Sequence, residues 1–588
     1  MRLTGPPLPL GRHATLVEAL AAAVDHPSGV TFVGLREEES WRSWGEVHES
    51  AARVGGALAA LGVLPGDRVG IVLRTGPEFL DAFLGAWLAG AVPVPLYPPV
   101  RLGRMEEYLE GTARMLAVSG ARVLLSTGAV QRLLGGAVER AWPALGCHDV
   151  ATLRAGGSAS RVGAPDPAAL GLVQFSSGST VDPKPVALSH AALVAQVSAL
   201  QAAVRPDARD VLVSWLPLYH DMGLIGGLLG ALSYPGPLVL IAPEHFLARP
   251  ALWLRAIARH RGTLSMAPSF AYAYCADRVK EADLAGLSLA SWRLALDGAE
   301  AVSAEAMRRF AARFAPAGFD PGALVPVYGL SEAALAVTFG RPGRALEGRR
   351  VDPARLAREG RVAPGRREIV PVGTPVPGFE VEVRGEGGAL AGEGRLGRIF
   401  ARGPSIMDGY LGDPAATARA LRDGWLDTGD LGFVADGELH VHGRAKDVVI
   451  VRGANHAPEE FEAALAGIAG LRPGCAVALG VAGEDGAEAL LVLAERTRER
   501  AQGRDDAALV AAARAAVLER TGVAPRIALL APGTLPRTSS GKLRRQEALR
   551  RHLAGALTPP RPAGVLRLAL EAARSQLAWA RARRRPSP

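Results

Sequence analysis

Buried strands that alternate with helices are the feature that most limits how this chain can fold. Residues 68–73 are apolar and β-branched, residues 77–88 carry apolar side chains at helical spacing, and residues 91–96 form a second apolar strand closed by prolines. The same alternation continues to about residue 328. Strand–helix–strand units of this kind predict an α/β fold with mostly parallel sheets flanked by helices. The further strands expected are 121–125, 170–175, 211–215, 237–241, 294–296 and 324–328, with helices at 189–204 and 304–314.

The alternation stops after this region. Residues 341–368 are rich in arginine and glycine with few apolar positions, which indicates an insertion. Short strands with turns follow at 369–433 and predict a distorted β subdomain. Together these segments complete a large N-terminal domain of residues 1–443.

A second, smaller unit is expected after a junction at residues 444–447. Residues 448–555 contain two helices and two strands of their own, which predicts a small α+β domain. Residues 556–588 form a basic tail with a candidate amphipathic helix at 565–585. That helix could contact a membrane, an acidic carrier protein or nothing specific.

Charge and composition narrow the possible partners and the location. A net charge of +9 suits acidic partners. Aromatic residues make up only 5% and do not alternate with a basic stripe, so no nucleic-acid partner is expected. The first 20 residues lack the basic region and apolar core of a secretory signal. The uncharged window 223–243 is broken by glycines and prolines, which argues against a membrane span. Three isolated cysteines fit no disulfide or metal-ligand spacing, so a cytoplasmic protein without a transmembrane segment is predicted.

Polar or glycine-rich loops follow several of the expected strands. In open α/β sheets, ligands bind at the carboxyl ends of the strands, so these loops could converge on one site. The loops are 176–180, 217–221, 297–300 and 329–332.

The first of these loops has the composition of a phosphate-binding turn. Ser176, Ser177, Gly178, Ser179 and Thr180 supply hydroxyls and accessible backbone N–H groups, and Lys184 adds a positive charge. The Walker spacing is absent, and an ordinary Ser/Gly turn is the plain alternative. Only four of the 67 basic residues are lysines, so a retained lysine suggests a task that arginine cannot perform.

Five motifs in a fixed order resemble those of the adenylate-forming (AMP-binding) superfamily. The segment 175–184 (FSSGSTVDPK) resembles its phosphate loop, and the others are YGLSE at 328–332, TGD at 428–430, GRAKD at 443–447 and PRTSSGK at 536–542. Narrower motifs resemble fatty acyl-AMP ligases: WLPLYHDMGLIG at 215–226, APSFAY at 267–272, GAE at 298–300 and GANH at 453–456. The resemblance covers about residues 14–555, and the arginine-rich excursion falls where those ligases carry an insertion.

The resemblance implies a reaction in two halves. A fatty-acid carboxylate would attack ATP in the presence of Mg²⁺, giving acyl-AMP and pyrophosphate, and the thiol of a holo acyl carrier protein with an acidic surface would then displace AMP. Rotation of a mobile C-terminal domain about the hinge residue Lys446 would serve the two halves. An acyl-CoA ligase is one alternative, which the insertion argues against. A non-catalytic nucleotide-binding scaffold is another, which the intact Lys542, Glu332 and Asp430 argue against.

The resemblance also assigns roles to individual residues. Lys542 would be the catalytic cation that bridges the carboxylate and the α-phosphate, Glu332 the Mg²⁺ ligand, and Asp430 the acceptor for the ribose hydroxyls, with Arg444 near the ribose or phosphates. The plain alternatives are a solvated basic run for Lys542, a glutamate at a helix start for Glu332 and a turn aspartate for Asp430. The other nucleotide-binding residues expected are Gly298, Ala299, Glu300, Tyr328, Gly329 and Ser331, and the acyl-binding residues are His220, Asp221, Met222, Gly223 and Phe270.

Four positions depart from the family pattern. Val181 and Asp182 stand where relatives often have threonine and glycine. Pro185 stands where relatives often have glycine, so the distal half of the phosphate loop is expected to be stiffer and to offer one donor fewer. Asp297 stands where relatives often have asparagine, which would change the contact with adenine.

Overall fold

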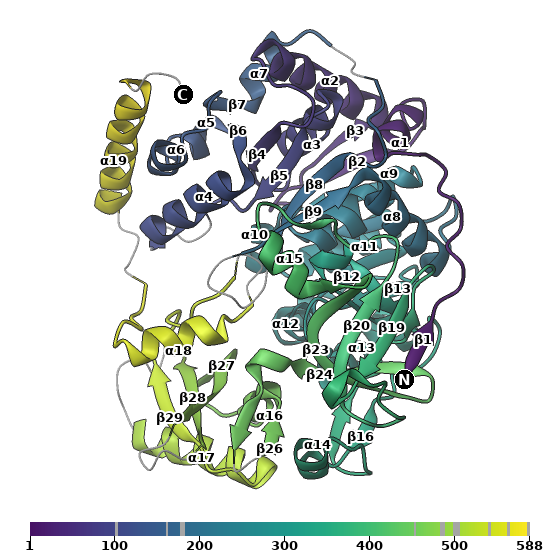
Figure 1. Cartoon of the computed structure of the whole chain (residues 1–588), viewed down its shortest axis with the longest axis vertical. Helices are drawn as coiled ribbons and strands as arrows, with labels where there is room; N and C mark the ends of the chain where they lie inside the picture. The colour runs from purple at the N-terminus through teal and green to yellow at the C-terminus, as the bar shows by residue number, and fades with distance from the viewer. Residues whose placement is uncertain are drawn as a thin grey trace.

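A nine-stranded sheet forms the centre of the large domain in the computed structural model (Figure 1). The structure describes residues 1–99, 104–159, 163–176, 183–451, 454–482, 488–497, 506–538, 542–560 and 565–584. The six central strands, from β14 to β2, run parallel, and antiparallel strands close both edges. The strand order is β18 (Thr374–Pro375), β15 (Ala336–Phe339), β14 (Leu324–Gly329), β13 (Leu294–Asp297), β12 (Leu264–Ala267), β10 (Leu212–Ser214), β11 (Leu238–Ile241), β2 (Gly29–Val33) and β3 (Glu39–Ser43).

A second sheet is parallel throughout and lies beside the first. Its order is β5 (Val92–Leu96), β4 (Arg68–Val72), β6 (Ala121–Ser126) and β7 (Cys147–Asp149). Helix α3 (Pro77–Leu88) is buried from Phe79 to Leu88 and packs against α2 (Trp44–Ala60), which Ser43 and Glu46 cap reciprocally. These elements confirm the predicted alternation of strands and helices.

The loop after residue 175 differs from a strand-to-helix junction. Strand β8 (Leu170–Phe175) turns back into the antiparallel β9 (Pro185–Ser189), which also pairs with β21 (Gly409–Tyr410). Helix α8 (His190–Val204) begins only after β9, with Ser189 as its N-cap. The apolar run after Lys184 continues as a strand, so the predicted phosphate loop joins a hairpin.

The distorted β subdomain is a six-stranded antiparallel sheet. It contains β1 (Arg2–Thr4), β19 (Glu380–Arg384), β20 (Gly397–Arg402), β22 (Leu421–Arg422), β23 (Trp425–Ala435) and β24 (Glu438–Arg444). Register shifts in β20 and in β23 account for its distortion.

The segment predicted to be an insertion has structure of its own. It forms the antiparallel pair β16 (Arg349–Val351) and β17 (Arg367–Ile369) with α14 (Pro353–Glu359) between them. Val351, Leu356 and Ile369 are buried in one apolar cluster with Phe433 of β23. This segment is therefore packed onto the β subdomain.

The small domain has apolar clusters of its own. Its sheet comprises β27 (Leu471–Ala482), β28 (Glu488–Arg496) and β29 (Arg526–Leu530), with α16 (Pro458–Ala463), α17 (Asp506–Thr521) and α18 (Arg545–Leu553) packed around it and the hairpin β25 (Val449–Val451) and β26 (Ala454–His456) beside it. Arg551 of α18 forms ion pairs of 2.5 and 3.3 Å with Glu107 of α4 (Met105–Ser119) in the large domain. Arg367 of β17 lies 3.5 Å from Glu460 of α16.

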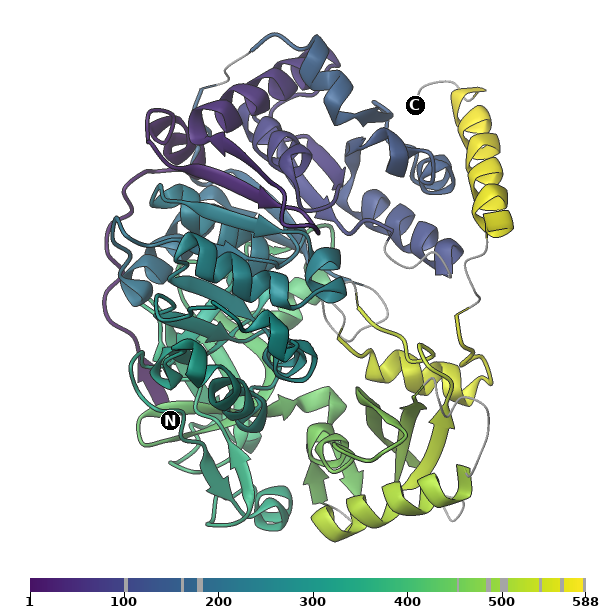
Figure 2. The ribbon, with the colours of Figure 1, turned by 180° about the vertical axis from the view of Figure 1, so that it is seen from behind.

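The tail helix returns to the large domain. Helix α19 (Val565–Arg584) lies along α6 (Gly135–Ala141) at one edge of the molecule, as both views show (Figures 1 and 2). The backbone N–H of Gly135 donates to Ser575 Oγ at 2.8 Å, and Trp579 Nε1 donates to the Gln131 carbonyl at 3.1 Å. No helix in the described part of the chain has the length and apolar character that a membrane span requires. One side of the tail helix therefore rests on the protein itself.

Candidate active site

One cavity of about 2960 Å³ lies between the carboxyl ends of the central strands and the small domain. The loops that follow β10, β13 and β14 all contribute to its wall, as does the end of β8. The cavity thus brings together residues that are far apart in the sequence, as the strand-end pattern predicted. Its lining includes Ser176, His220, Asp221, Met222, Phe270, Ala299, Glu300, Tyr328, Gly329, Ser331, Glu332, Asp430, Arg444 and Lys542.

Four other predicted site residues are described but do not line this cavity: Lys184, Gly223, Gly298 and Lys446. Ser177, Gly178, Ser179 and Thr180 lie outside the described residues, as do Val181 and Asp182. What the structure places is the base of the predicted phosphate loop. There the Ser176 N–H donates to the Lys184 carbonyl at 2.9 Å, and the Lys184 N–H donates to Ser176 Oγ at 3.3 Å.

Asp430 is a buried carboxylate held between an arginine and a tyrosine. Asp430 and Arg444 are partners on the adjacent strands β23 and β24, and Arg444 Nε lies 2.9 Å from Oδ1. The hydroxyl of Tyr328, at the end of β14, donates to Oδ2 at 2.7 Å. Burial raises the pKa of Asp430, and the Arg444 guanidinium opposes this shift. Each carboxylate oxygen has a further lone pair, so both can still accept a sugar hydroxyl.

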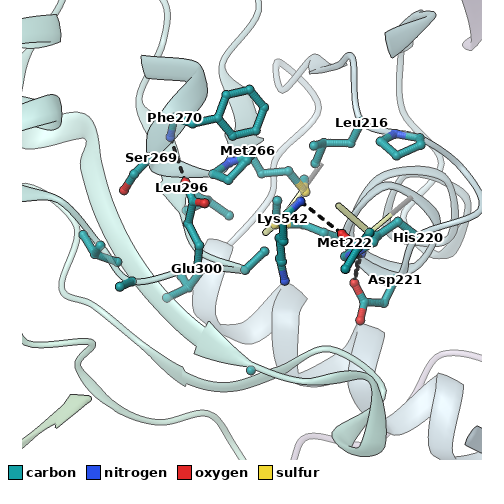
Figure 3. A pocket seen from close by; sticks show the side chains of 18 of the residues that line it. Leu216, His220, Asp221, Met222, Met266, Ser269, Phe270, Leu296, Glu300 and Lys542 are labelled. Atoms are coloured by element: carbon teal, nitrogen blue, oxygen red, sulfur yellow. Dashed lines mark hydrogen bonds and ion pairs between the residues drawn. The ribbon is translucent and has the colours of Figure 1, made fainter. Parts of the chain in front are cut away.

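Lys542 brings a positive charge from the small domain into this cavity. The loop that carries it is closed at its base, because the Lys542 N–H donates to Thr538 Oγ1 at 3.0 Å and the Thr538 N–H to the Lys542 carbonyl at 2.7 Å. Figure 3 shows the side chain pointing into the cavity between Glu300 and Asp221. Burial among protein atoms lowers the pKa of Lys542, while the charges of Asp221, Glu300 and Asp430 act in the opposite direction. The Lys542 side chain lines the cavity, where its compact positive charge can meet an anion.

Tyr410, which the sequence motifs did not indicate, contacts both Lys184 and Glu332. Lys184 Nζ lies 4.3 Å from the centre of the Tyr410 ring, and the Tyr410 hydroxyl donates to Glu332 Oε1 at 3.0 Å. Tyr410 belongs to β21, which pairs with β9 immediately after the phosphate loop. Only this long-range pairing reveals its place in the site.

Glu332 offers a hard carboxylate oxygen at the cavity wall. The described residues contain no group of three or more His, Cys, Asp or Glu placed to hold a metal ion. A Mg²⁺ ion that takes most of its ligands from phosphates and water needs only one or two carboxylates, so Glu332 fits that ion.

Lys446 and Lys542 both lie close enough to Asp430 for their charges to act on it, and Lys184 is a neighbour of Lys446. Burial lowers the pKa of Lys446, with Arg444 and Lys184 among the neighbouring positive charges and Asp430 among the negative ones. Lys542 is influenced by the same Asp430 and Arg444.

His220, Asp221 and Ser331 form a chain of hydrogen bonds in the cavity wall, and Figure 3 shows the first two side by side. His220 Nδ1 lies 2.6 Å from Asp221 Oδ1, and the Ser331 hydroxyl donates to Oδ2. The backbone N–H of Met222, where the π-helix η2 (Met222–Leu229) begins, also donates to Oδ1, at 2.7 Å. Burial would raise the pKa of Asp221, but His220, Ser331 and Lys542 together hold it well below its usual value. Asp221 is therefore an ionised carboxylate with its oxygens directed at protein donors.

The other wall of this region is apolar. Phe270 is 38% exposed and packs edge-on against Trp215, with ring centres 6.0 Å apart. Its backbone N–H donates to Glu300 Oε1 at 2.8 Å, and burial raises the pKa of Glu300. Figure 3 shows Leu216, Met222, Met266 and Leu296 around the same space. An apolar tail with a polar head group fits such a surface.

Three predicted site glycines are required by backbone packing. A Cβ on Gly298 would lie 2.6 Å from Val327 Cγ2, and one on Gly223 would lie 2.4 Å from the Pro217 carbonyl oxygen. A Cβ on Gly329 would lie 1.7 Å from the Leu335 carbonyl oxygen. These glycines let neighbouring loops approach closely, and the first two support the cavity wall from behind.

Asp297, which departs from the family pattern, lies behind that wall. It is fully buried, its Oδ2 accepts a hydrogen bond from the Ser269 hydroxyl, and burial raises its pKa well above the usual value. Asp297 is absent from the cavity lining.

Comparison with known proteins places the chain in a family. The model of the AMP-binding enzyme family matches residues 20–411. A Caulobacter vibrioides protein provisionally named an acyl-CoA synthetase is 36% identical over 554 residues, covering 92% of this chain and 96% of that protein. The long-chain-fatty-acid–AMP ligase FadD26 of Mycobacterium marinum is 33% identical over 544 residues, covering 87% of this chain and 91% of that ligase.

Solved structures agree with the sequence matches. A structure from a study of fatty acyl-adenylate ligases from E. coli and L. pneumophila superimposes with a TM-score of 0.87 at 32% identity, covering 93% of this chain and 99% of that one. The predicted fold class is thereby confirmed. The chain belongs to the AMP-binding enzyme family of adenylate-forming ligases, and its predicted resemblance to fatty acyl-AMP ligases is confirmed.

Proposed function

We propose that this ligase activates a fatty acid with ATP to acyl-AMP and then transfers the acyl group to the phosphopantetheine thiol of an acyl carrier protein. The observation that carries the proposal is the single cavity in which Lys542 of the small domain, Asp430 and Arg444 of the large domain and an apolar wall meet. ATP and a carboxylate are both anionic, so a site that joins them must supply positive charge and hold them in line.

In the first half-reaction, a carboxylate oxygen attacks the α-phosphorus, and the bond from that phosphorus to the pyrophosphate oxygen breaks. Asp430 would hold the ribose hydroxyls and Arg444 would lie beside them, while Lys184 and the phosphate loop would face the outer phosphates. Lys542, carried in by the small domain, would neutralise charge between the carboxylate and the α-phosphate. A Mg²⁺ ion held by Glu332 would neutralise phosphate charge when bound.

In the second half-reaction, the thiol forms a bond to the acyl carbon and the bond to AMP breaks. We assign the hinge to residues 444–447, because the apolar cluster of the small domain begins at Val449 and Lys446 lies between the two domains. The lid would comprise residues 448–555 and would rotate to admit the thiol.

The insertion supports an acyl carrier protein as acceptor. Besides the Arg367–Glu460 ion pair, Arg366 donates a hydrogen bond to the Arg520 carbonyl of α17. These contacts, with the insertion anchored through Leu356, would restrain the lid. Coenzyme A remains the alternative acceptor, because a 36% identical relative carries an acyl-CoA synthetase name.

One assay tests both halves. The protein is incubated with ATP, Mg²⁺ and fatty acids of graded chain length, and pyrophosphate release and acyl-AMP are measured. Parallel reactions contain coenzyme A or a holo acyl carrier protein. We expect acyl-AMP with the acid alone and acyl transfer to the carrier. Fast acyl-CoA formation would overturn the choice of acceptor, and a failure to form any adenylate would favour a nucleotide-binding scaffold.

A further inference from the structure

Tyr410 touches two charged side chains that would face the triphosphate and its metal ion. Lys184 Nζ lies 4.3 Å from the centre of the Tyr410 ring, and the Tyr410 hydroxyl lies 3.0 Å from Glu332 Oε1. An ionised carboxylate only accepts hydrogen bonds, so the phenol is the donor of this pair. Tyr410 itself is 8% exposed and is absent from the cavity lining, whereas Glu332 lines the cavity. Tyr410 therefore stands behind the cavity wall and can act on a ligand only through other side chains.

We propose that Tyr410 is a positioning residue that holds the Lys184 ammonium with its ring and the Glu332 carboxylate with its hydroxyl, so that both are in place before magnesium-bound ATP arrives. This inference rests on the proposed function. A cation is attracted to the face of an aromatic ring, and a hydrogen bond to an ionised carboxylate is stronger than one between neutral groups. One side chain therefore fixes the places of two opposite charges.

The two charges contact the tyrosine instead of each other. Among the ion pairs of the described residues, none joins Lys184 to Glu332, and each side chain has its own contact on Tyr410. A direct pair would let the two groups neutralise one another, and neither would then be free for a phosphate oxygen or a metal ion. The tyrosine thus keeps both charges available to a ligand.

Backbone hydrogen bonds hold the segment around Tyr410 from both sides. The Met407 N–H donates to the Glu332 carbonyl at 2.8 Å, and the Leu411 N–H donates to the carbonyl of Pro185, the first residue of β9, at 2.8 Å. This segment is therefore tied both to the residue that offers the metal a carboxylate and to the strand that follows the phosphate loop. A rigid link of this kind lets one side chain set two ligand-binding groups that are distant in the sequence.

Isothermal titration calorimetry without a fatty acid tests the two contacts separately, because ATP binding is then measured in the absence of the reaction. ATP is titrated into the full chain with excess EDTA or with excess Mg²⁺. Tyr410→Phe keeps the ring and loses the hydroxyl. Its affinity for magnesium-bound ATP should fall about 10–100-fold, the usual loss when a ligating carboxylate loses its hydrogen-bond donor, while its affinity for metal-free ATP should stay within about twofold. Tyr410→Leu loses both contacts, so its affinity for metal-free ATP should also fall, by about 2–5-fold.

Tyr272→Phe is the matched control, because it also removes a buried hydroxyl. The Tyr272 hydroxyl donates to the Leu296 carbonyl at 2.8 Å, and Tyr272 does not line the cavity, so this variant should lower the Tm and leave both affinities unchanged. All titrations run well below the Tm of each variant. The inference is overturned if Tyr410→Phe changes neither affinity or lowers both by the same factor, or if Tyr410→Leu binds metal-free ATP as tightly as the unmodified protein. If the unmodified protein binds no ATP, the proposed function fails instead.

Discussion

Removal of the Lys542 charge should strongly slow acyl-AMP formation. Lys542 is the side chain that the small domain places between Asp221 and Glu300, close to Asp430 and Arg444. Two unit charges about 4 Å apart in surroundings of effective dielectric constant about 20 interact by about 4 kcal/mol. Mutation of one preorganised donor elsewhere costs about 3–4 kcal/mol. Because each 1.4 kcal/mol is a factor of ten, Lys542→Ala should reduce the adenylation rate by about 10²–10³-fold.

The assay is single-turnover pyrophosphate release with saturating ATP and fatty acid. Lys542→Arg keeps the charge but replaces a compact ammonium with a wide planar group, so it should restore only part of the rate. Lys280 provides a matched control, because it is exposed and lies outside the cavity, and Lys280→Ala should behave as the unmodified protein. If Lys542→Ala keeps more than about a tenth of the rate, the assigned electrostatic role is refuted.

Three further predictions concern the tail, the lid and the cysteines. Gly135→Ala should release α19 and make the tail sensitive to trypsin, because the new Cβ would lie 2.2 Å from the Ser575 carbonyl oxygen. Gly156→Ala is the control: its Cβ would meet nothing within 4 Å, so the tail should stay resistant to trypsin. Glu107→Gln should weaken the ion pair with Arg551 by up to about 1 kcal/mol and increase hydrogen exchange in α18. Unchanged exchange would show that this ion pair does not hold the small domain against the large one. The three cysteines, Cys147, Cys275 and Cys475, should resist a thiol reagent in the native protein at pH 8 and react fully after denaturation. Burial raises the pKa of each thiol, that of Cys147 to about 12, so the reactive thiolate is scarce at pH 8. A fast reaction of the native protein would refute this prediction.

Much of the architecture follows from local patterns in the sequence. Continuous apolar runs predict β4, β5, β13 and β14, and a period-3.6 apolar pattern predicts α3, all to within a residue or two. Short apolar runs indicate buried strands, and the helical period reflects which face of a helix is buried. The motif order and the retained lysines also direct attention to Asp430, Lys542 and Lys184. These patterns and motifs are local, so they can be read from the sequence without knowledge of the fold.

Tertiary structure alone decided how those pieces meet. The polar loop after β8 joins a hairpin, and Tyr410 contacts Lys184 and Glu332 because β21 pairs with β9. Ser331 donates a hydrogen bond to Asp221, 110 residues away in the chain. The tail helix likewise rests on α6 through Ser575 and Trp579. Each of these contacts depends on the pairing of strands or the packing of helices that are distant in the chain. Periodicity tells which face of an element is buried, whereas the partner of that face is set by the packing of the whole molecule.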